Sequence, residues 1–261
     1  MRIITLTTDL GIKDHYVAIV KGEIYSQIED INIVDISHEI SKFNIQEAAF
    51  VFKNAYKNFP KETIHIIGVN EELSSENQHV AIKVNDQYVI GPDNGIFSLI
   101  FEETYDMKIV QLNISQETDN FTFAIKDIFT KAACHLARGG TLEIIGSPMD
   151  DFTNKGSSLK AVTEKNIIKG IITHIDSYGN ATTNISKDIF EKIGFGRKFE
   201  ILYGRENEKI TNIQEKYKDV SEGERLALFS YNDLLEIAIN QGKANELLGL
   251  HLFDIIRVEF Q

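Results

Sequence analysis

The chain has only one cysteine, Cys134, among its 261 residues. A single thiol cannot close an intrachain disulfide, which fits a reducing compartment. Cys134 lies in an apolar stretch of helical character, so we interpret it as a buried core residue rather than a reactive thiol. Asp9 comes too early for the apolar region of a signal peptide, and no run of about 18 apolar residues occurs. We therefore expect a soluble, cytoplasmic protein.

Basic residues are also in the minority. Lys and Arg total 27 against 39 for Asp and Glu, which leaves a formal charge of −12. This balance argues against sequence-independent binding to nucleic acid, which depends on basic patches, and against an anionic membrane surface. It does not exclude a cationic small molecule as the ligand. The length suits one large domain or two modest ones.

Strand-like and helix-like segments alternate through the first half of the chain. Apolar, β-rich segments are expected at residues 2–7, 31–37, 63–69, 79–84, 87–91 and 107–113. A hairpin turn is expected at Asn85 and Asp86. Amphipathic helices are expected from Asp14, after Asn44 as N-cap, and over residues 126–140. The alternation predicts an α/β domain with a mostly parallel sheet covered by helices on both faces.

The second half has a different pattern. Short β-rich segments separated by turn residues follow after about residue 155, and only residues 238–249 have a helical pattern. The stretch 149–162 is rich in polar and small residues, as expected at a boundary. We predict an α/β N-terminal domain over residues 1–155 and a smaller, β-rich C-terminal domain over residues 156–261.

The segment T-T-D-L-G-I-K-D, residues 7–14, joins the first expected strand to the first expected helix. In open α/β sheets ligands bind beyond the carboxyl ends of the strands, so Asp9 is suited to accept hydrogen bonds from both hydroxyls of a ribose. Asp14 lies near the positive end of the helix. The structural alternative is that these carboxylates cap the turn and the helix. No G-x-G-x-x-G signature is present here, so an ordinary dinucleotide site is not supported.

Three further segments combine turn residues with groups suited to a nucleoside. Asn94 in G-P-D-N-G can face a pocket, or the segment can serve only as a tight turn. In I-D-S-Y-G-N, Tyr178 is suited to stack on a purine, Asn180 to pair with its edge, and Asp176 to pair with an ammonium. The structural alternative is a hairpin turn. Residues 230–240 place polar groups before a short apolar run, and there the alternative is a loop that enters a strand.

Taken together, these segments resemble the S-adenosylmethionine hydroxide adenosyltransferase family, the relatives of fluorinase. The similarity is carried, in order, by T-T-D-L-G-x-x-D-x-Y, D-I-S-H, G-P-D-N-G, D-x-F-x-x-A-A-x-H-L-A, I-D-x-x-G-N and L-E-I-A-I-N. It runs over nearly the whole chain. Each motif alone is weakly specific, but a chance match of all six in this order is implausible.

The resemblance implies an N-terminal α/β domain, a β-rich C-terminal domain and a homotrimer whose ligand sites lie between subunits. The implied substrate is S-adenosylmethionine, from which methionine is displaced by attack at the ribose 5′ carbon. The nucleophile is water or hydroxide in most members and a halide in a few. Neither a metal nor a separate cofactor is implied. A site of carboxylates and aromatic faces suits this substrate, because it carries a sulfonium and an ammonium.

The resemblance also assigns binding residues to each part of the substrate. Asp9 matches the carboxylate that holds the ribose, and Phe43 matches an aromatic residue that packs against the ligand. Asp176 matches the carboxylate near the methionine amine, while Tyr231 and Asn232 fall where the methionine carboxylate is held. The residues assigned to the surroundings of the adenine are Tyr178, Asn180 and Asn240.

The similarity fails at the centre of the chemistry. Hydrolytic members carry D-P-G-V-G followed by paired arginines, whereas residues 68–80 here read G-V-N-E-E-L-S-S-E-N-Q-H-V. Asn70 or Glu71 stands at or near the expected aspartate. F-A-I-K-D replaces F-H-G-R-D, which puts Ala124 at the histidine and Lys126 at the arginine. The Asp-Arg-His set that organises water in the family is therefore lost or rebuilt.

A rebuilt centre would draw on the loop that follows the third expected strand. Our catalytic candidates are Asn70, Glu71 and His79, with Glu72 and Glu76 as further carboxylates. An exposed loop histidine is the alternative for His79. We expect hydrolysis of S-adenosylmethionine to adenosine and methionine. A non-catalytic adenosyl-binding protein, and a lyase that releases methylthioadenosine, stay open, because the sequence does not identify the nucleophile.

Overall fold

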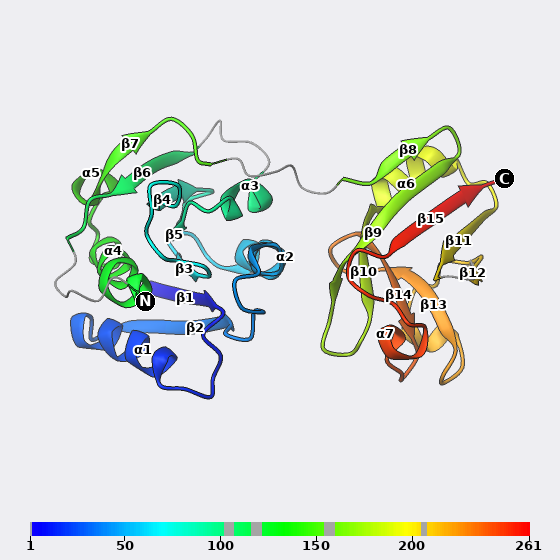
Figure 1. Ribbon diagram of the computed structural model, residues 1–261, viewed down its shortest axis with the longest axis horizontal. Helices are drawn as coiled ribbons and strands as arrows, with labels where there is room; N and C mark the ends of the chain where they lie inside the picture. The colour runs from blue at the N-terminus through cyan, green and yellow to red at the C-terminus, as the bar shows by residue number, and fades with distance from the viewer. Residues whose placement is uncertain (1, 102–106, 116–121, 154–159, 205–207) are drawn as a thin grey trace. The chain divides into compact units, whose positions relative to one another are not determined.

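The computed structural model describes residues 2–101, 107–115, 122–153, 160–204 and 208–261. The chain divides into two compact units, Met1–Ser158 and Leu159–Gln261 (Figure 1). The predicted boundary after residue 155 falls within 154–159, outside the described residues. Among the helices of the described residues, none is both long and apolar enough to span a membrane.

The N-terminal unit is built on a seven-stranded mixed sheet. Its strands are, in spatial order, β2 (Ile31–Ser37), β1 (Arg2–Thr8), β3 (Ile64–Gly68), β5 (Gln87–Pro92), β4 (His79–Val84), β6 (Lys108–Leu112) and β7 (Gly146–Met149). The strands from β2 to β5 run parallel to one another, and β4, β6 and β7 complete the sheet with antiparallel pairings. The predicted α/β class is confirmed, and the parallel pairing is confined to the half of the sheet that begins with β2.

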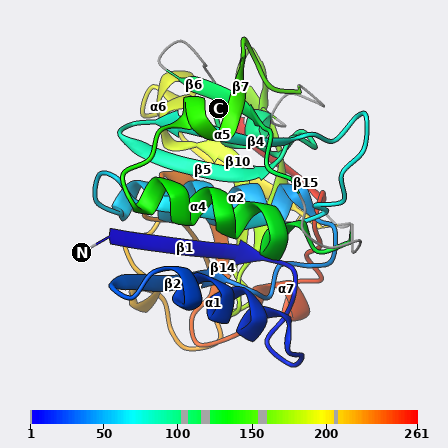
Figure 2. The same ribbon diagram turned by 90° about the vertical axis from the view of Figure 1, so that its left-hand side faces the viewer.

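Helices cover both faces of this sheet, as predicted (Figures 1 and 2). One apolar layer contains side chains of α1 (Tyr16–Gln27) and of η2 (Ile125–Phe129), which continues into α4 (Thr130–Ala137). The other contains side chains of α2 (Ile45–Ala55) and α3 (Ile96–Ile100). The remaining short helices are η1 (Tyr56–Asn58) and α5 (Leu142–Ile145).

Local sequence signals explain several boundaries in this unit. Asn44 caps α2 by accepting a hydrogen bond from the Glu47 N–H at 3.1 Å, as predicted. The predicted hairpin turn is also confirmed, since Asn85 and Asp86 have φ angles of 51° and 59° between two antiparallel strands. The predicted start of α1 at Asp14 is wrong. His15 is the N-cap, and its side chain accepts no capping hydrogen bond.

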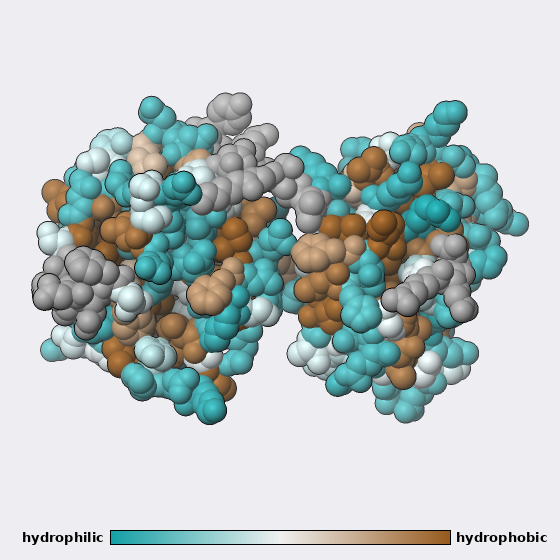
Figure 3. Space-filling view, in the orientation of Figure 1, coloured by the Kyte–Doolittle hydropathy of each residue, from teal (hydrophilic) through white to brown (hydrophobic). Residues whose placement is uncertain are grey.

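The C-terminal unit is β-rich, as predicted. Its strands are β12 (Glu208–Ile210), β11 (Phe199–Tyr203), β15 (Ile255–Phe260), β9 (Ile167–Ile175), β10 (Ala181–Ser186), β14 (Leu234–Ile239) and β13 (Arg225–Phe229) in spatial order, with β8 (Val162–Glu164) on β9. All of these pairings are antiparallel. The strands enclose an isoleucine-rich core. On the drawn face of both units, apolar side chains are interspersed with hydrophilic ones (Figure 3).

Three helical segments accompany these strands: α6 (Lys187–Gly194), η3 (Tyr217–Asp219) and α7 (Ala244–Leu247). The helix predicted within residues 238–249 is present as the single turn of α7, preceded by the end of β14. Residues 187–194 were expected to contain no helix, and this expectation is wrong. Ser186 caps α6 by accepting from the Ile189 N–H at 3.3 Å.

Candidate functional site

The loops that carry the predicted ribose carboxylate lie where the order of the parallel strands reverses. β1 pairs with β2 on one side and with β3 on the other, so the chain leaves β1 in one direction and returns on its opposite side. Thr8 and Gly68 are paired at the carboxyl ends of β1 and β3, and the Asp9 N–H donates to the Gly68 carbonyl at 3.4 Å. Such a switch point is the expected place for a ligand in an open α/β sheet.

Asp9 is held at this point by the loop that follows β2. Its Oδ2 accepts a hydrogen bond from the Phe43 N–H at 2.8 Å, and the Lys42 ammonium donates to its carbonyl oxygen. Phe43 has a positive φ of 63° and a 72% exposed side chain. Within the described residues Oδ1 of Asp9 has no hydrogen-bond partner. One carboxylate oxygen and an exposed aromatic ring are therefore available side by side.

Glu71 follows β3 and brings a second carboxyl group to the same place. Although the residue is partly exposed, its Oε2 is buried and has no hydrogen-bond partner in the described part of the chain. A Cβ on Gly68 would lie 3.0 Å from this Oε2 and 2.5 Å from Ile125 Cδ1, so the close approach depends on glycine. Burial raises the pKa of Glu71 to about 8; the charge of Asp9 adds to the rise, and the N–H groups of Ile125 and Ala124 oppose it.

Asn70 and Asn94 shape the loop that carries Glu71. Asn70 has a positive φ of 51°, and its carbonyl accepts from the side-chain amides of Asn77 at 3.1 Å and Asn94 at 3.2 Å. The buried amide of Asn94 also donates to the Val69 carbonyl at 3.0 Å. Asn94 thus holds the backbone of the loop in place through its side-chain amide, while the side chain of Asn70 is exposed.

His79 begins β4, and its side chain lies behind Glu71. It is 3% exposed, its Nε2 lies 2.8 Å from the Glu71 carbonyl oxygen, and its ring meets the edge of Phe129. Because a carbonyl only accepts, Nε2 carries the hydrogen. Burial lowers the pKa of His79, and the bond to the Glu71 backbone opposes that change. The interpretation as an exposed loop histidine is wrong. Glu72 and Glu76 are exposed.

The positions that match the family's histidine and arginine hold Ala124 and Lys126. Ala124 is buried and caps η2, where its backbone faces Glu71. The Lys126 ammonium lies 2.8 Å from Asp127 Oδ1. The residues that do surround the Glu71 carboxyl are Asp9, Gly68, Ala124 and Ile125.

The C-terminal unit contains a cavity of about 850 Å³. Its lining comprises Asp176, Ser177, Tyr178, Asn180, Lys216, Tyr217, Lys218, Ile239, Asn240, Gln241, Gly242 and Lys243. Four of these lining residues were predicted from the sequence as ligand-binding residues: Asp176, Tyr178, Asn180 and Asn240. Asp176 organises the first loop, because its Oδ1 accepts from the N–H groups of Tyr178 at 2.9 Å and Asn180 at 2.8 Å. Asn180 is buried, whereas the ring of Tyr178 is 77% exposed.

Tyr217, which lines this cavity, and Glu236, its hydrogen-bond partner on β14, escaped the sequence prediction. The Tyr217 hydroxyl donates to Oε1 of the buried Glu236 at 2.8 Å. Burial raises the pKa of both groups, and their hydrogen bond adds to the rise for Tyr217. Glu236 lies inside the L-E-I-A-I-N motif, and a carboxylate within an apolar strand was the signal that could have identified it. Asn240 is fixed beside them by donating to the Val220 carbonyl at 2.8 Å.

Two predicted residues of the C-terminal unit, Tyr231 and Asn232, lie outside the lining of this cavity. Tyr231 is 78% exposed in the turn before β14. Oδ1 of Asn232 accepts from the Ser230 hydroxyl at 2.7 Å and from the Leu234 N–H at 3.2 Å, which shapes that turn. Asp14 belongs to the N-terminal unit, where it is exposed just ahead of α1.

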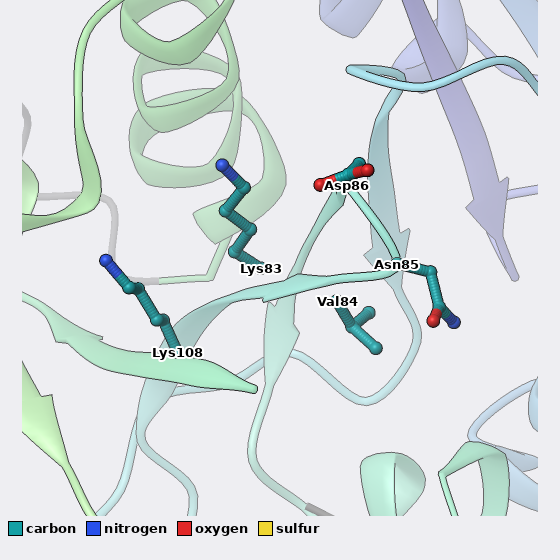
Figure 4. Close-up of a pocket in the computed structure, with 5 residues that line it drawn as sticks. All are labelled: Lys83, Val84, Asn85, Asp86 and Lys108. Carbon is teal, nitrogen blue, oxygen red and sulfur yellow. The ribbon is translucent and has the colours of Figure 1, made fainter. Parts of the chain in front are cut away.

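A second, smaller cavity of about 340 Å³ lies on the β4–β5 hairpin and is lined by Lys83, Val84, Asn85, Asp86 and Lys108. The two lysines extend in the same direction (Figure 4). The hairpin turn precedes β5, so this cavity is at the amino ends of the parallel strands, the end opposite Asp9. Its cationic lining is unsuited to a sulfonium. Among the described residues, no group of three or more His, Cys, Asp and Glu side chains is arranged to hold a metal ion.

Known proteins are similar to this chain in sequence and in fold. Residues 4–146 match the family model described as SAM hydroxide adenosyltransferase N-terminal domain, and residues 170–257 match the corresponding C-terminal domain. The chain is 28% identical to an (R)-S-adenosyl-L-methionine hydrolase from Methanocaldococcus jannaschii, over 98% of this chain and 95% of that protein. It is 26% identical to a fluorinase from Nocardia brasiliensis over 74% of each chain. An uncharacterized conserved protein from Thermotoga maritima has a crystal structure that superposes with a TM-score of 0.88 at 30% identity, covering 99% of both chains.

Proposed function

The chain belongs to the S-adenosylmethionine hydroxide adenosyltransferase family, and we propose that it hydrolyses S-adenosylmethionine to adenosine and methionine. The observation that carries this proposal is that Asp9, bonded through its N–H to Gly68, and the buried Oε2 of Glu71, packed against Gly68, both lie at the switch point of the sheet. One carboxylate suits the ribose hydroxyls, and the other suits a water molecule beside the ribose. The name of the hydrolase relative supports the same reaction.

Recognition of the substrate is divided between the two units. In the N-terminal unit, Asp9 accepts hydrogen bonds from the ribose and Phe43 packs against the ligand. In the C-terminal unit, the adenine stacks on Tyr178 and pairs with Asn180, and the backbone near Asn240 frames its edge. The cavity volume of about 850 Å³ is large enough for a nucleoside.

We further propose a homotrimer in which each ligand lies between the N-terminal unit of one subunit and the C-terminal unit of its neighbour. The family resemblance supports this assembly. Tyr231 and Asn232 then hold the methionine carboxylate, and Asp14 and Asn94 support the ribose side of the site. The reaction needs no cofactor, since the sulfonium is itself the leaving group. A cytoplasmic location agrees with the single, buried cysteine.

In the proposed reaction, the water oxygen forms a bond to the ribose 5′ carbon while the carbon–sulfur bond breaks. The electron pair of that bond goes to sulfur and leaves a neutral thioether, and the water proton goes to Glu71. The main requirements are in-line placement and a partly desolvated nucleophile. Glu71 is better suited to accept the proton than His79, because the His79 ring is only 3% exposed and burial lowers its pKa. Asn70 and His79 act by holding the loop.

Incubation with S-adenosylmethionine and chromatography of the products tests the reaction. Adenosine with methionine supports hydrolysis, and methylthioadenosine would support a lyase instead. Measurable binding without turnover would support a binding protein, an outcome that the loss of the family's histidine and arginine makes worth testing. The control is Glu71→Gln, which keeps the shape of the side chain but cannot accept the proton.

A further inference from the structure

A series of polar side chains leads from α1, through β2 and the residue just after it, to the end of β1. The Lys21 ammonium lies 2.6 Å from Asp35 Oδ2, and Asp35 Oδ1 lies 3.0 Å from His38 Nε2. The other ring nitrogen of His38, Nδ1, is 2.7 Å from the hydroxyl of Thr8. Thr8 is fully buried and His38 is 5% exposed. The two residues therefore depend on each other for hydrogen bonding.

The charge on Asp35 determines which groups donate and which accept in this series of contacts. Burial acts to raise the pKa of Asp35, but the hydrogen bond from Lys21 and the charges of Lys21 and His38 hold it below its ordinary value. The 3.0 Å contact between Asp35 Oδ1 and His38 Nε2 is an electrostatic one, not aligned as a hydrogen bond, and the nearby carboxylate favours the hydrogen of His38 on Nε2. His38 then accepts at Nδ1. The Thr8 hydroxyl then donates to His38, and its oxygen is free to accept from the Leu10 N–H at 3.3 Å.

This series of contacts reaches the residues on both sides of Asp9, the proposed ribose carboxylate. Thr8 and Leu10 are the immediate neighbours of Asp9. The Thr8 hydroxyl oxygen accepts a hydrogen bond from the Leu10 N–H. His38 also accepts at its backbone carbonyl from the Gly11 N–H at 2.7 Å. We propose that His38 is a positioning residue, which acts through Thr8 to fix the backbone that aims the Asp9 carboxylate at the ribose. This inference rests on the proposed function of Asp9.

The fold contains a matched control for this role. Thr5, on the same strand, is bonded in the same way, since its hydroxyl lies 2.7 Å from Nδ1 of His65 and both residues are fully buried. That pair lies further back along β1, away from its carboxyl end. Thr5→Val and Thr8→Val each remove one buried threonine–histidine hydrogen bond with little change of shape. Only the second one lies next to Asp9.

The test measures calorimetric binding of adenosine and of 2′,3′-dideoxyadenosine to the full-length protein. Thr8→Val is expected to weaken adenosine binding about 10-fold, the equivalent of one lost hydrogen bond, and to leave dideoxyadenosine binding nearly unchanged. Thr8→Ser, which restores the hydroxyl, should recover the wild-type preference. Thr5→Val should lower the unfolding temperature without changing the preference between the two ligands.

Two outcomes would overturn the inference. Equal losses of affinity for both ligands in Thr8→Val would mean that these hydrogen bonds only stabilise the fold, and unchanged affinity for both ligands would mean that Asp9 needs no such support. A wild-type protein that binds both ligands equally would instead remove the ribose role of Asp9, and with it this inference. Product analysis with S-adenosylmethionine then tells whether hydrolysis itself survives.

Discussion

The two units build their parts of the site in opposite ways. The N-terminal unit brings the carboxyl groups of Asp9 and Glu71 together, and one buried oxygen of Glu71 lacks a hydrogen-bond partner among the described residues. The cavity of the C-terminal unit is bounded by loops whose polar groups satisfy each other, as Asp176 does for Tyr178 and Asn180. Two carboxyl groups with an unsatisfied buried oxygen suit proton transfer, whereas polar groups that satisfy one another suit recognition of a fixed shape. We therefore assign chemistry to the first unit and adenine recognition to the second.

The sharpest test of this division is Glu71→Gln. Loss of a general base is expected to lower kcat roughly 100- to 10,000-fold. Binding of adenosine should change little, since the amide keeps the shape of the side chain. Single-turnover kinetics and calorimetry on the same preparations measure the two quantities. Wild-type turnover in this variant would exclude Glu71 as the base.

We expect acid to destabilise the N-terminal unit before the C-terminal unit. Burial lowers the pKa of His65 from its ordinary value of 6.5 to about 4, and this histidine lies in the core of the N-terminal unit. The neutral ring is the form that the fold accepts, so the stabilising contribution is fully present above pH 6.5 and is lost as the pH falls towards 4. The full loss amounts to about 3 kcal/mol.

Hydrogen exchange resolved along the sequence measures this difference between pH 7 and pH 4.5. We expect protection to fall first in β3, which carries His65, and in β1, whose Thr5 is bonded to it. Strands β9 and β14 of the C-terminal unit should keep their protection over the same range. Simultaneous loss in both units would show that some other titration governs acid unfolding.

Asn180→Ala examines the other side of the comparison. Removing a buried amide from the adenine cavity is expected to cost on the order of 1.5–3 kcal/mol, or roughly 10- to 150-fold in affinity. At saturating substrate, kcat should be nearly that of the wild type. A variant that lost kcat without losing affinity would contradict the assignment of recognition to this unit.

The smallest expected effect is a shift of the pH–rate profile. If Glu71 is the base, kcat/KM should rise with pH through about 8, the pKa to which burial and Asp9 raise it. Asp9→Asn removes one cause of that rise, so the rising limb should move to lower pH. The matched variant Asp14→Asn, at an exposed position before α1, should leave the limb where it is. A limb that does not move in Asp9→Asn would mean that the two carboxyl groups are not coupled.

Periodicity was sufficient to predict the class of both units, because strand and helix patterns differ in repeat and in the residues that interrupt them. It could not locate α6, whose eight residues follow β10 without a break and depend on the Ser186 cap. The mixed half of the first sheet also lies beyond periodicity, since an apolar alternating strand reads alike in either direction.

Within the site, motifs predicted position better than role. One cavity does contain Asp176, Tyr178, Asn180 and Asn240. The sequence could not show that the Asp176 carboxylate already accepts hydrogen bonds from the N–H groups of its own loop. The role of His79 was also hidden, because its burial behind Glu71 depends on the pairing of β4 with β5. Hydrogen-bond partners at distant positions are a property of the fold, and local spacing does not encode them.

The protonated state of Glu71 has a consequence for how charge moves when the ligand arrives. At pH 7 a carboxyl with a pKa of about 8 is mostly neutral in the empty site. A bound sulfonium favours the carboxylate, so binding should release a proton to the solvent and exchange one positive charge for another. The measured enthalpy of binding would then depend on the ionisation enthalpy of the buffer, and affinity would rise with pH up to about 8. The substrate would itself switch on the base that attacks it through water.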